Sequence, residues 1–505
     1  MVAVSTVSCE KFLDVNKDPR YPASSSSQML FASGVAWSAS RLGRDGQLVG
    51  EIWSQHYTQN NAANQYKEID YYNMANNSTY STNLWSSMYA GALPDLKIAI
   101  AQSEANSEWN YWLAAKVMTA FDFHLLVSFF EKIPFTDALK GETNLTPAFD
   151  EGKTVDAGIV ALLDEAIAKK NDAAAIISMG ANDFVFGGDI DNWVKFAKTL
   201  KLKVLMRDFA ANQAAIQALL TEDDLLTVDA KMTGFVDATN NSNPLYEADR
   251  RALNTNTNLR ASATLVTFLN TYSDPRAAAL FEPVTKDPVL VSGDWEWTVD
   301  APAGTYRGLD QGSADLFEQA VFPTPAHSRA RLAATDAVYF LSASDSYFLQ
   351  AEAYARLSNA GQAKAKYDLG VEAAFARWGY TAQAATFIGT GGAYEFQSGS
   401  LDDMLKSILM QKWISTTRCN SWDAFFDINR TGIPALGSEM VNDADAPALP
   451  NTSYVLGTLA PSSGSVLPAG DYPRRLLFTK SSSDYNPNTP SADDYPLQRK
   501  MWWHK

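Results

Sequence analysis

Hydrophobic positions in the first part of the chain recur at helical spacing. From residue 28 to residue 56, Met29, Phe31 and Val35 fall near one face of a helix, and the pattern ends close to Trp53. Apolar residues spaced near 3.6 positions are typical of helices that cover a core. The same spacing predicts four more helices, over residues 82–104, 108–131, 154–170 and 190–213.

A polar segment separates the first two of these helices. Residues 55–66 are rich in Asn and Gln. Asn favours turns over helix interiors because its side chain competes for backbone hydrogen bonds. We therefore expect an exposed loop here, and this loop includes Asn60 and Asn61.

The helical periodicity is lost in the middle and at the end of the chain. Residues 214–340 are rich in Asn, Asp, Thr, Gly and Pro, which predicts a long loop region with short strands and as many as two helices. Over residues 435–505, repeated prolines exclude long helices because proline cannot sit inside one. No change of composition marks a linker, so we expect one body rather than separate domains.

Residues 344–377 match one unit of a tetratricopeptide repeat. Positions 4, 8, 11, 20, 24 and 27 of this 34-residue unit are Tyr347, Ala351, Tyr354, Ala363, Tyr367 and Gly370. The small residues let two antiparallel helices approach closely, and the aromatic residues fill the space beside them. A further amphipathic helix is expected over residues 401–416. The predicted fold class is therefore all-α dominated, a tetratricopeptide-type helical-repeat scaffold with a loop-rich irregular region and short strands.

The composition restricts the kinds of partner. The chain has 505 residues, of which 46% are hydrophobic, so it can bury a large core. Its formal net charge of -16 opposes binding to phosphate backbones, and we expect no nucleic-acid partner. No run of about 18 consecutive apolar residues occurs, which predicts that no segment spans a membrane.

The sequence carries no recognisable catalytic or metal-binding motif. The four histidines, at positions 56, 124, 327 and 504, form no HExxH pattern, and neither a GxSxG elbow nor a Walker loop occurs. The Gly-rich segment 388–393 lacks the lysine of a phosphate-binding loop. Only two cysteines occur, and Cys419 is expected to be a packed free thiol. We therefore expect a binding protein without metal or cofactor, and not an enzyme.

Aromatic residues within the polar middle region are the candidates for ligand contact. Trp295 and Trp297 flank Glu296, and Tyr306 follows within the same region. Sugars present flat C–H faces that pack on indole and phenol rings, while their hydroxyl groups need polar partners. These residues therefore favour reversible glycan binding. The alternative is that both tryptophans pack the irregular region against the helices.

The segment around Cys9 resembles the cleavage junction of a bacterial lipoprotein. A short apolar run, Val4 to Val7, precedes Cys9, which is followed at once by charged residues. In this interpretation residues 1–8 are a signal-peptide remnant and Cys9 carries a lipid anchor. Thr6 stands where such junctions usually have Leu, and the alternative is an incidental cysteine in an ordinary N-terminal segment.

Seven short segments, spread over nearly the whole chain, form a recognisable set. In chain order they are Cys9-Glu10-Lys11-Phe12-Leu13-Asp14, Ile133-Pro134-Phe135-Thr136-Asp137, Trp193-Val194-Lys195-Phe196-Ala197, Ser273-Asp274-Pro275-Arg276, Trp422-Asp423-Ala424-Phe425, Arg430-Thr431-Gly432-Ile433-Pro434 and Lys500-Met501-Trp502-Trp503. Together they resemble the SusD/RagB family, surface lipoproteins that capture nutrients for the Bacteroidetes. Asn429 and His504 depart from the family pattern, which usually has Arg and an acid at those two places.

The resemblance implies an architecture and a way of working. It implies one body over residues 9–505, with tetratricopeptide-type helices within about 82–213 and 344–416, a ligand-facing region at about 214–340 and a loop-rich segment at 435–505. It also implies a cell-surface lipoprotein of the outer membrane, held by Cys9, that delivers oligosaccharides to a SusC-like TonB-dependent transporter. A peptide cargo is the alternative that the family allows.

The resemblance also suggests ligand-binding residues. Family members use a residue of the loop after the first long helix and an aromatic residue near the start of the next helix. For Trp85, which holds the second of these places, the alternative is packing between helices. With the aromatic residues of the irregular region, the candidate set is Asn60, Asn61, Trp85, Trp295, Trp297 and Tyr306.

Overall fold

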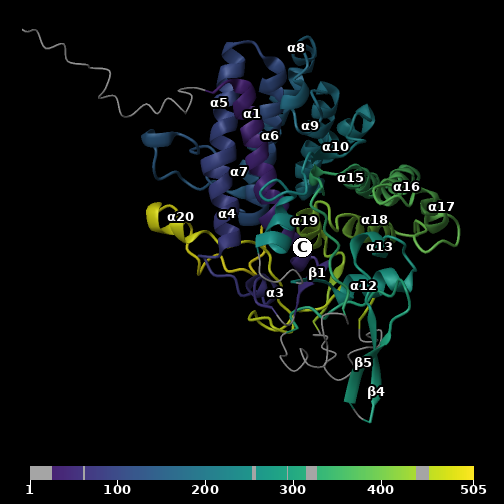
Figure 1. Ribbon diagram of the computed structural model, residues 1–505. Coiled ribbons are helices and arrows are strands. Elements are labelled where there is room, and N and C mark those ends of the chain that lie inside the picture. The colour runs from purple at the N-terminus through teal and green to yellow at the C-terminus, as the bar shows by residue number, and fades with distance from the viewer. Residues whose placement is uncertain (1–24, 61–62, 253–257, 293, 314–326, 439–453) are drawn as a thin grey trace, which may run out of the picture.

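The structure, a computed structural model, describes residues 25–60, 63–252, 258–292, 294–313, 327–438 and 454–505. Helices gather at one end of the molecule, while loops and short strands gather at the other (Figure 1). The main hydrophobic core includes residues from Phe31 to Leu497, so the N-terminal and C-terminal parts of the described chain share it. This arrangement confirms the predicted fold class.

The N-terminal part is a helical bundle. Its helices are α1 (Ser27–Arg41), α2 (Gln47–Trp53), α4 (Thr79–Ser87), α5 (Leu93–Ala105), α6 (Trp109–Phe130), α7 (Gly152–Ala168), α8 (Lys170–Ala174), α9 (Ile190–Leu205) and α10 (Phe209–Glu222). Single π-helical turns at Leu42–Gly46 and Met88–Ala92 continue α1 into α2 and α4 into α5. The apolar helix α6 packs against α1, α5, α7 and α9, which places it at the centre of the bundle.

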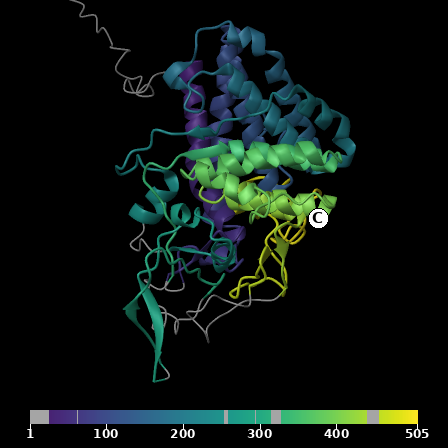
Figure 2. The same cartoon turned by 90° about the vertical axis from the view of Figure 1, so that its right-hand side faces the viewer.

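A second group of helices crosses below this bundle (Figure 2). It comprises α15 (Ala343–Arg356), α16 (Ala360–Ala376), α17 (Thr381–Ile388), α18 (Leu401–Ser415) and α19 (Ser421–Thr431). Helices α15 and α16 form the tetratricopeptide pair that the sequence predicts. At their contact Gly370 faces Phe348, and a Cβ atom on Gly370 would lie only 2.7 Å from the phenyl ring. The small residue is therefore what allows this approach.

The other end of the molecule is irregular. Its short helices are α3 (Lys67–Asp70), α11 (Pro244–Tyr246), α12 (Ala263–Thr271), α13 (Ala277–Leu280) and α20 (Lys480–Tyr485), with a π-helical turn at Glu247–Ala252. The strands form two-stranded pairs: β1 (Tyr57–Gln59) with β3 (Leu259–Ala261), β2 (Ala230–Met232) with β6 (Val338–Leu341), β4 (Lys286–Val291) with β5 (Asp294–Asp300), and β7 (Ala435–Leu436) with β8 (Thr458–Leu459). Only the last pair is parallel.

The polar segment after α2 is buried, so the prediction of an exposed loop over residues 55–66 was wrong for most of it. Gln55 and Gln59 are fully buried. The Gln55 amide oxygen accepts hydrogen bonds from the Thr264 hydroxyl and the Ala460 N–H, and the Gln59 amide oxygen accepts one from the Tyr66 N–H. Because these amides have partners, burial costs little. The asparagine-rich composition indicates that the segment does not form a helix, but it does not indicate whether the segment is exposed or buried.

The helix predicted over 190–213 is interrupted. Helix α9 ends at Leu205, a single 3-10 turn follows at Met206–Asp208, and α10 continues to Glu222. The Asp208 carboxylate caps α10 by accepting a hydrogen bond from the Ala211 N–H. The loop-rich region therefore begins about nine residues later than the predicted residue 214.

Helix α6 bears on the prediction that no segment spans a membrane. Among the described residues, this one helix is long and apolar enough by composition, although Lys116, Asp122 and His124 interrupt it. Its most apolar stretch is 94% buried inside the protein. The helix is thus the core of the bundle.

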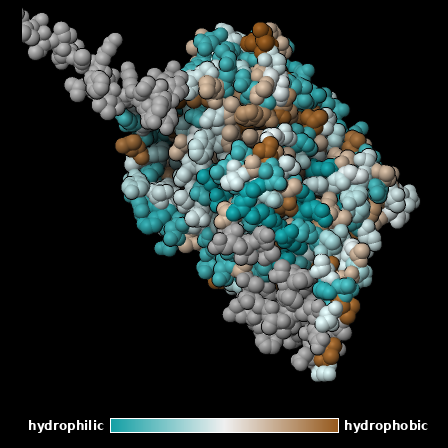
Figure 3. Space-filling model, viewed as in Figure 1, coloured by the Kyte–Doolittle hydropathy of each residue, from teal (hydrophilic) through white to brown (hydrophobic). Residues whose placement is uncertain are grey.

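On the face drawn in Figure 3 the surface is largely hydrophilic, and hydrophobic side chains are scattered over it.

A buried ionic network joins the two helical groups. The Lys412 ammonium on α18 lies 2.8 Å from the Asp345 carboxylate on α15 and 2.6 Å from Asp427 on α19. Lys203 on α9 lies 2.9 Å from the same Asp345 and 2.8 Å from Asp423. Burial opposes ionisation, but Lys412 nevertheless holds the pKa of Asp427 well below its usual range. The network therefore consists of charged pairs, and the attraction within each pair offsets the loss of hydration on folding.

Candidate ligand-binding site

Tyr306 lines an open cavity at the irregular end of the molecule. The cavity, called here the Tyr306 cavity, has a volume of about 390 Å³ and lies between the end of α12, the start of α13 and the turn at 304–306. Polar residues share its lining with Tyr306: Asn270, Ser273, Asp274 and Thr305. An aromatic face beside hydroxyl, amide and carboxylate groups is the surface that a sugar ring needs.

Local backbone geometry shapes this cavity. Gly304 adopts a φ of +81°, which favours glycine, and thereby turns the chain back toward α12. The Asn270 side chain then donates a hydrogen bond of 2.9 Å to the Tyr306 carbonyl oxygen. Ser273 also has a positive φ, +51°, where the chain leaves α12. The two segments are therefore fixed to each other before any ligand arrives.

Asp274 supports the cavity wall. Its carboxylate accepts hydrogen bonds from the Arg276 guanidinium at 2.6 and 3.0 Å and from the Tyr394 hydroxyl at 2.7 Å. Burial alone would raise the pKa of Asp274, but Arg276 holds it below its usual value. Because its oxygens are already engaged, Asp274 fixes the loop before α13, and Asn270, Ser273 and Thr305 are the polar groups nearer to solvent.

The hairpin of β4 and β5 adjoins the Tyr306 cavity. The Val284 N–H donates to the Thr305 carbonyl oxygen at 2.9 Å, and the Arg307 guanidinium donates to Asp287 at 2.6 Å. From this base the hairpin extends away from the helices (Figures 1 and 2). Its second strand, β5, carries Trp295 and Trp297, with Trp295 opposite Leu290 in the register. The side chains of the two tryptophans lie outside the described residues.

Asn60 lies in the same half of the molecule, but it is buried. Its N–H extends the β1–β3 pairing by donating to the Asn258 carbonyl oxygen at 2.6 Å, and only 5% of the residue is exposed. Strand β3 leads directly into α12, so Asn60 lies on the segment next to the cavity without lining it. Asn61 lies outside the described residues.

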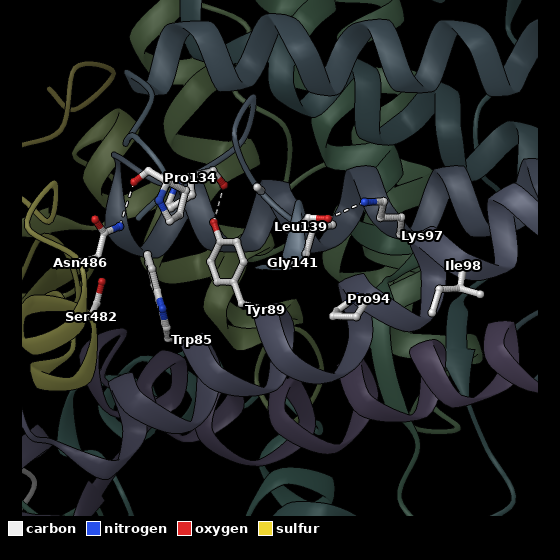
Figure 4. A pocket seen from close by; sticks show the side chains of 12 residues that line it. Trp85, Tyr89, Pro94, Lys97, Ile98, Pro134, Leu139, Gly141, Ser482 and Asn486 are labelled. Atoms are coloured by element: carbon white, nitrogen blue, oxygen red, sulfur yellow. Dashed lines mark hydrogen bonds between the residues drawn. The ribbon is translucent and has the colours of Figure 1, made fainter. Parts of the chain in front are cut away.

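Trp85 does not line the Tyr306 cavity. It belongs to α4, is 8% exposed, and packs edge-on against Phe130 at 5.1 Å and parallel to Phe149 at 5.9 Å between ring centroids. Its remaining surface lines a different cavity of about 510 Å³, called here the Trp85 cavity (Figure 4). The structure therefore does not bring Trp85 and Tyr306 into one pocket, and the packing alternative accounts for most of the indole surface.

Outside these cavities, the buried titratable groups show no arrangement for metal binding among the described residues, and two of them, His124 and Cys419, are uncharged. Among the described residues, no group of three or more His, Cys, Asp or Glu side chains is placed to hold a metal ion. Burial lowers the pKa of His124, with the nearby Arg207 acting in the same direction, so this imidazole stays neutral. Burial also raises the pKa of the Cys419 thiol to about 12, and Cys419 is the packed free thiol that the sequence predicts.

The molecule is therefore a helical-repeat scaffold whose irregular end carries an open cavity with polar lining residues. The family model described as "Starch-binding associating with outer membrane" matches residues 27–454. The chain therefore belongs to this SusD-like family. A search of curated proteins gives no significant match.

Solved structures share the fold over almost their whole length. A SusD homologue from Bacteroides uniformis is 20% identical, with a TM-score of 0.71, and the match covers 95% of this chain and 98% of that chain. A chitin-binding SusD homologue from Flavobacterium johnsoniae is 19% identical, with a TM-score of 0.71 and coverage of 94% and 98%. A SusD/RagB family protein from Bacteroides thetaiotaomicron is 21% identical, with a TM-score of 0.69 and coverage of 95% and 99%.

Proposed function

We propose that this protein is a cell-surface lipoprotein that binds oligosaccharides and delivers them to a SusC-like TonB-dependent transporter, without catalysing a reaction. The observation that carries the proposal is the Tyr306 cavity, because Tyr306 lines it together with Asn270, Ser273 and Thr305 in a member of the SusD-like family. The chitin-binding relative from Flavobacterium johnsoniae supports a glycan as the ligand class.

The binding residues we propose are those at the irregular end. Tyr306 supplies a ring face, and Asn270 and Ser273 supply polar edges for the sugar hydroxyl groups. Trp295 and Trp297, which belong to β5 of the adjoining hairpin, are the further aromatic residues of the proposed set. An aromatic face contributes about 0.5–1.5 kcal/mol beyond burial, so two or three rings give weak and reversible capture. Trapping against a transporter would make weak affinity sufficient by raising the effective concentration.

The remaining candidates stay predictions. Asn60 adjoins this region, and a ligand contact from its side chain requires the residue to become accessible, since it is buried. Asn61 lies outside the described residues. Trp85 would contact the same ligand only if that ligand also reached the Trp85 cavity. Lipidation of Cys9 and the outer-membrane location belong to the proposal as well, and Cys9 lies outside the described residues.

Glycan arrays and calorimetry test this function. The wild-type protein should bind at least one oligosaccharide class, release no shorter product on long incubation, and lose most of its affinity when Trp295 and Trp297 are both replaced by Ala. The double variant should still co-purify with the transporter. A blank array together with peptides that co-purify with the transporter complex would favour peptide cargo. Product release that a single Asp or Glu replacement abolishes would indicate an enzyme instead.

A further inference from the structure

The Trp85 cavity differs in chemistry from the Tyr306 cavity. Its floor is formed by Trp85 and Tyr89, one helical turn apart, whose ring centroids lie 4.8 Å from each other. The segment 134–147 covers one side, and α20 closes one end (Figure 4). Eight of the twelve lining residues are Trp, Tyr, Pro, Ile, Leu or Ala. The cavity thus presents mainly carbon to its interior.

The polar groups around the Trp85 cavity are already engaged with backbone oxygens. The Tyr89 hydroxyl donates to the Pro134 carbonyl oxygen at 2.6 Å, and the Asn486 amide donates to the Pro147 carbonyl oxygen at 2.8 Å. The Lys97 ammonium donates to the Leu139 carbonyl oxygen. These bonds hold the covering segment in place over α4 and α5. They also occupy the Tyr89 hydroxyl donor and one N–H each of Asn486 and Lys97.

The covering segment is itself braced. The Asp150 carboxylate accepts hydrogen bonds from the Phe135 N–H at 3.0 Å and the Thr136 N–H at 2.9 Å. The opposite face of Trp85 rests on Phe149 and Phe130, so the floor is fixed as well. A cavity of about 510 Å³ with walls held in this way lies within the size range of preformed small-molecule pockets.

We propose that the Trp85 cavity is a second ligand site, which takes an aryl or acyl group with one anionic or hydrogen-bond-accepting end and does not take an oligosaccharide. An apolar group matches the ring and proline walls. The accepting end would lie at Lys97, because an ammonium has three N–H donors and the Leu139 carbonyl oxygen uses one of them. A sugar in the same place would lose water from hydroxyl groups all around its ring, and most of them would face the carbon-rich walls without a partner.

The site can be tested with a probe that has this chemistry, anilinonaphthalene sulfonate, whose fluorescence rises in apolar surroundings. The folded wild-type protein should bind it at a single saturable site. Ala138, which is half-buried and lines the cavity, offers a way to fill it: Ala138→Trp should weaken probe binding at least tenfold. Ala278→Trp, which fills the Tyr306 cavity in the same way, is the matched control and should leave probe binding unchanged.

Two further variants keep the test decisive if Ala138→Trp folds poorly. Ile98 lies at the mouth of the cavity and is 47% exposed, so the Ile98→Asp variant should fold normally. It should weaken probe binding, because the new carboxylate repels the sulfonate of the probe. Lys97→Met should weaken probe binding to a smaller extent, because it removes the ammonium group.

Probe affinity that is equal in the wild type, Ala138→Trp and Ile98→Asp would overturn the proposal, as would equal weakening by Ala278→Trp. Glycan binding serves as the independent readout. It should fall in Ala278→Trp and persist in Ala138→Trp, so the second site and the proposed function can fail separately.

Discussion

At the scale of single residues, Tyr306 carries the clearest prediction about binding. Tyr306→Ala should weaken oligosaccharide binding roughly two- to tenfold, because one aromatic face contributes about 0.5–1.5 kcal/mol. Tyr306→Phe should keep the affinity if the ring face makes the contact. Tyr485→Ala, which removes a tyrosine that is 81% exposed on α20, is the control and should have no effect. Calorimetric titration measures all three, and equal affinity of wild type and Tyr306→Ala would exclude this role.

The buried network around Lys412 should dominate the effect of single changes on stability. Lys412 is 1% exposed, and its removal leaves Asp345 and Asp427 with one cationic partner each, Lys203 and Arg430. Lys412→Met should therefore lower the free energy of unfolding by about 3–5 kcal/mol. Lys480→Met, which breaks an exposed pair with Asp484, should change it by less than about 0.5 kcal/mol. Urea denaturation of both variants measures the contrast.

Asp122 should make stability depend on pH in the direction opposite to an ordinary ion-paired carboxylate. It lies inside α6, where burial raises its pKa to about 8, and the Ser38 hydroxyl donates to it at 2.9 Å. The unfolded pKa is about 3.9, so the folded state holds the proton more tightly and stability falls as pH rises from about 4 to about 8. Relative to wild type, Asp122→Asn should gain up to about 1.4 kcal/mol per pH unit in this window.

The comparison between these two proteins isolates Asp122, because every other titrating group is present in both. The gain should be small near pH 4 and level off above pH 8. Thermal unfolding at matched pH values measures it. A constant difference between pH 4 and pH 8 would mean that Asp122 stays ionised in the folded protein.

The residues of the candidate site could be predicted from the sequence only in part. Tyr306 stands out because an aromatic residue among polar ones is unusual. Asn270, Ser273 and Thr305 resemble any other polar loop residues, and only folding brings the end of α12 beside the turn at 304–306. Trp85 was drawn into the candidate set by its place after the first long helix, which does not reveal that Phe130 and Phe149 cover it.

At the scale of helices and strands, Gly370 links the repeat pattern to packing. The spacing of residues 344–377 predicted a helix pair that α15 and α16 form. Gly370→Leu should force these helices apart, since its Cβ would lie 2.7 Å from the fully buried Phe348 ring. Overpacking of this kind costs about 1–3 kcal/mol of stability.

Gly361, at the start of α16, provides the control for Gly370. A Cβ on Gly361 would meet only the Asn359 side-chain oxygen, at 3.9 Å, so Gly361→Ala should be neutral or stabilise by up to about 1 kcal/mol. Thermal unfolding compares the two variants. Equal stability of Gly370→Leu and wild type would mean that the helix pair tolerates a wider separation than the repeat geometry implies.

The elements that the sequence did not predict share a physical cause. The segment 55–60 is polar yet buried, because its amides are satisfied by residues as distant as Ala460. The β1–β3 pairing likewise joins residue 57 to residue 261. Helical periodicity depends on neighbours within two turns and can be read locally, whereas short strands and buried polar loops depend on partners hundreds of positions away.

At the scale of the whole molecule, helix α6 bears on the proposed membrane location. Helix α6 is the one described segment with the length and composition of a membrane span, and 94% of its most apolar stretch is buried in the core. Moving it into a bilayer would expose the faces of α1, α5, α7 and α9 that pack against it. Insertion of α6 into a membrane is therefore incompatible with the folded protein, and the proposal places the attachment at a lipid on Cys9 instead.

Replacing Cys9 should consequently release the protein from membranes. In cells that process lipoproteins, Cys9→Ser should shift the protein from the membrane fraction to the aqueous fraction after a high-salt wash. Cys419→Ser is the matched control, because this thiol is buried and takes no part in attachment, so the protein should stay in the membrane fraction. Retention of Cys9→Ser after the wash would show that a protein partner, and not a lipid, holds the folded body at the surface.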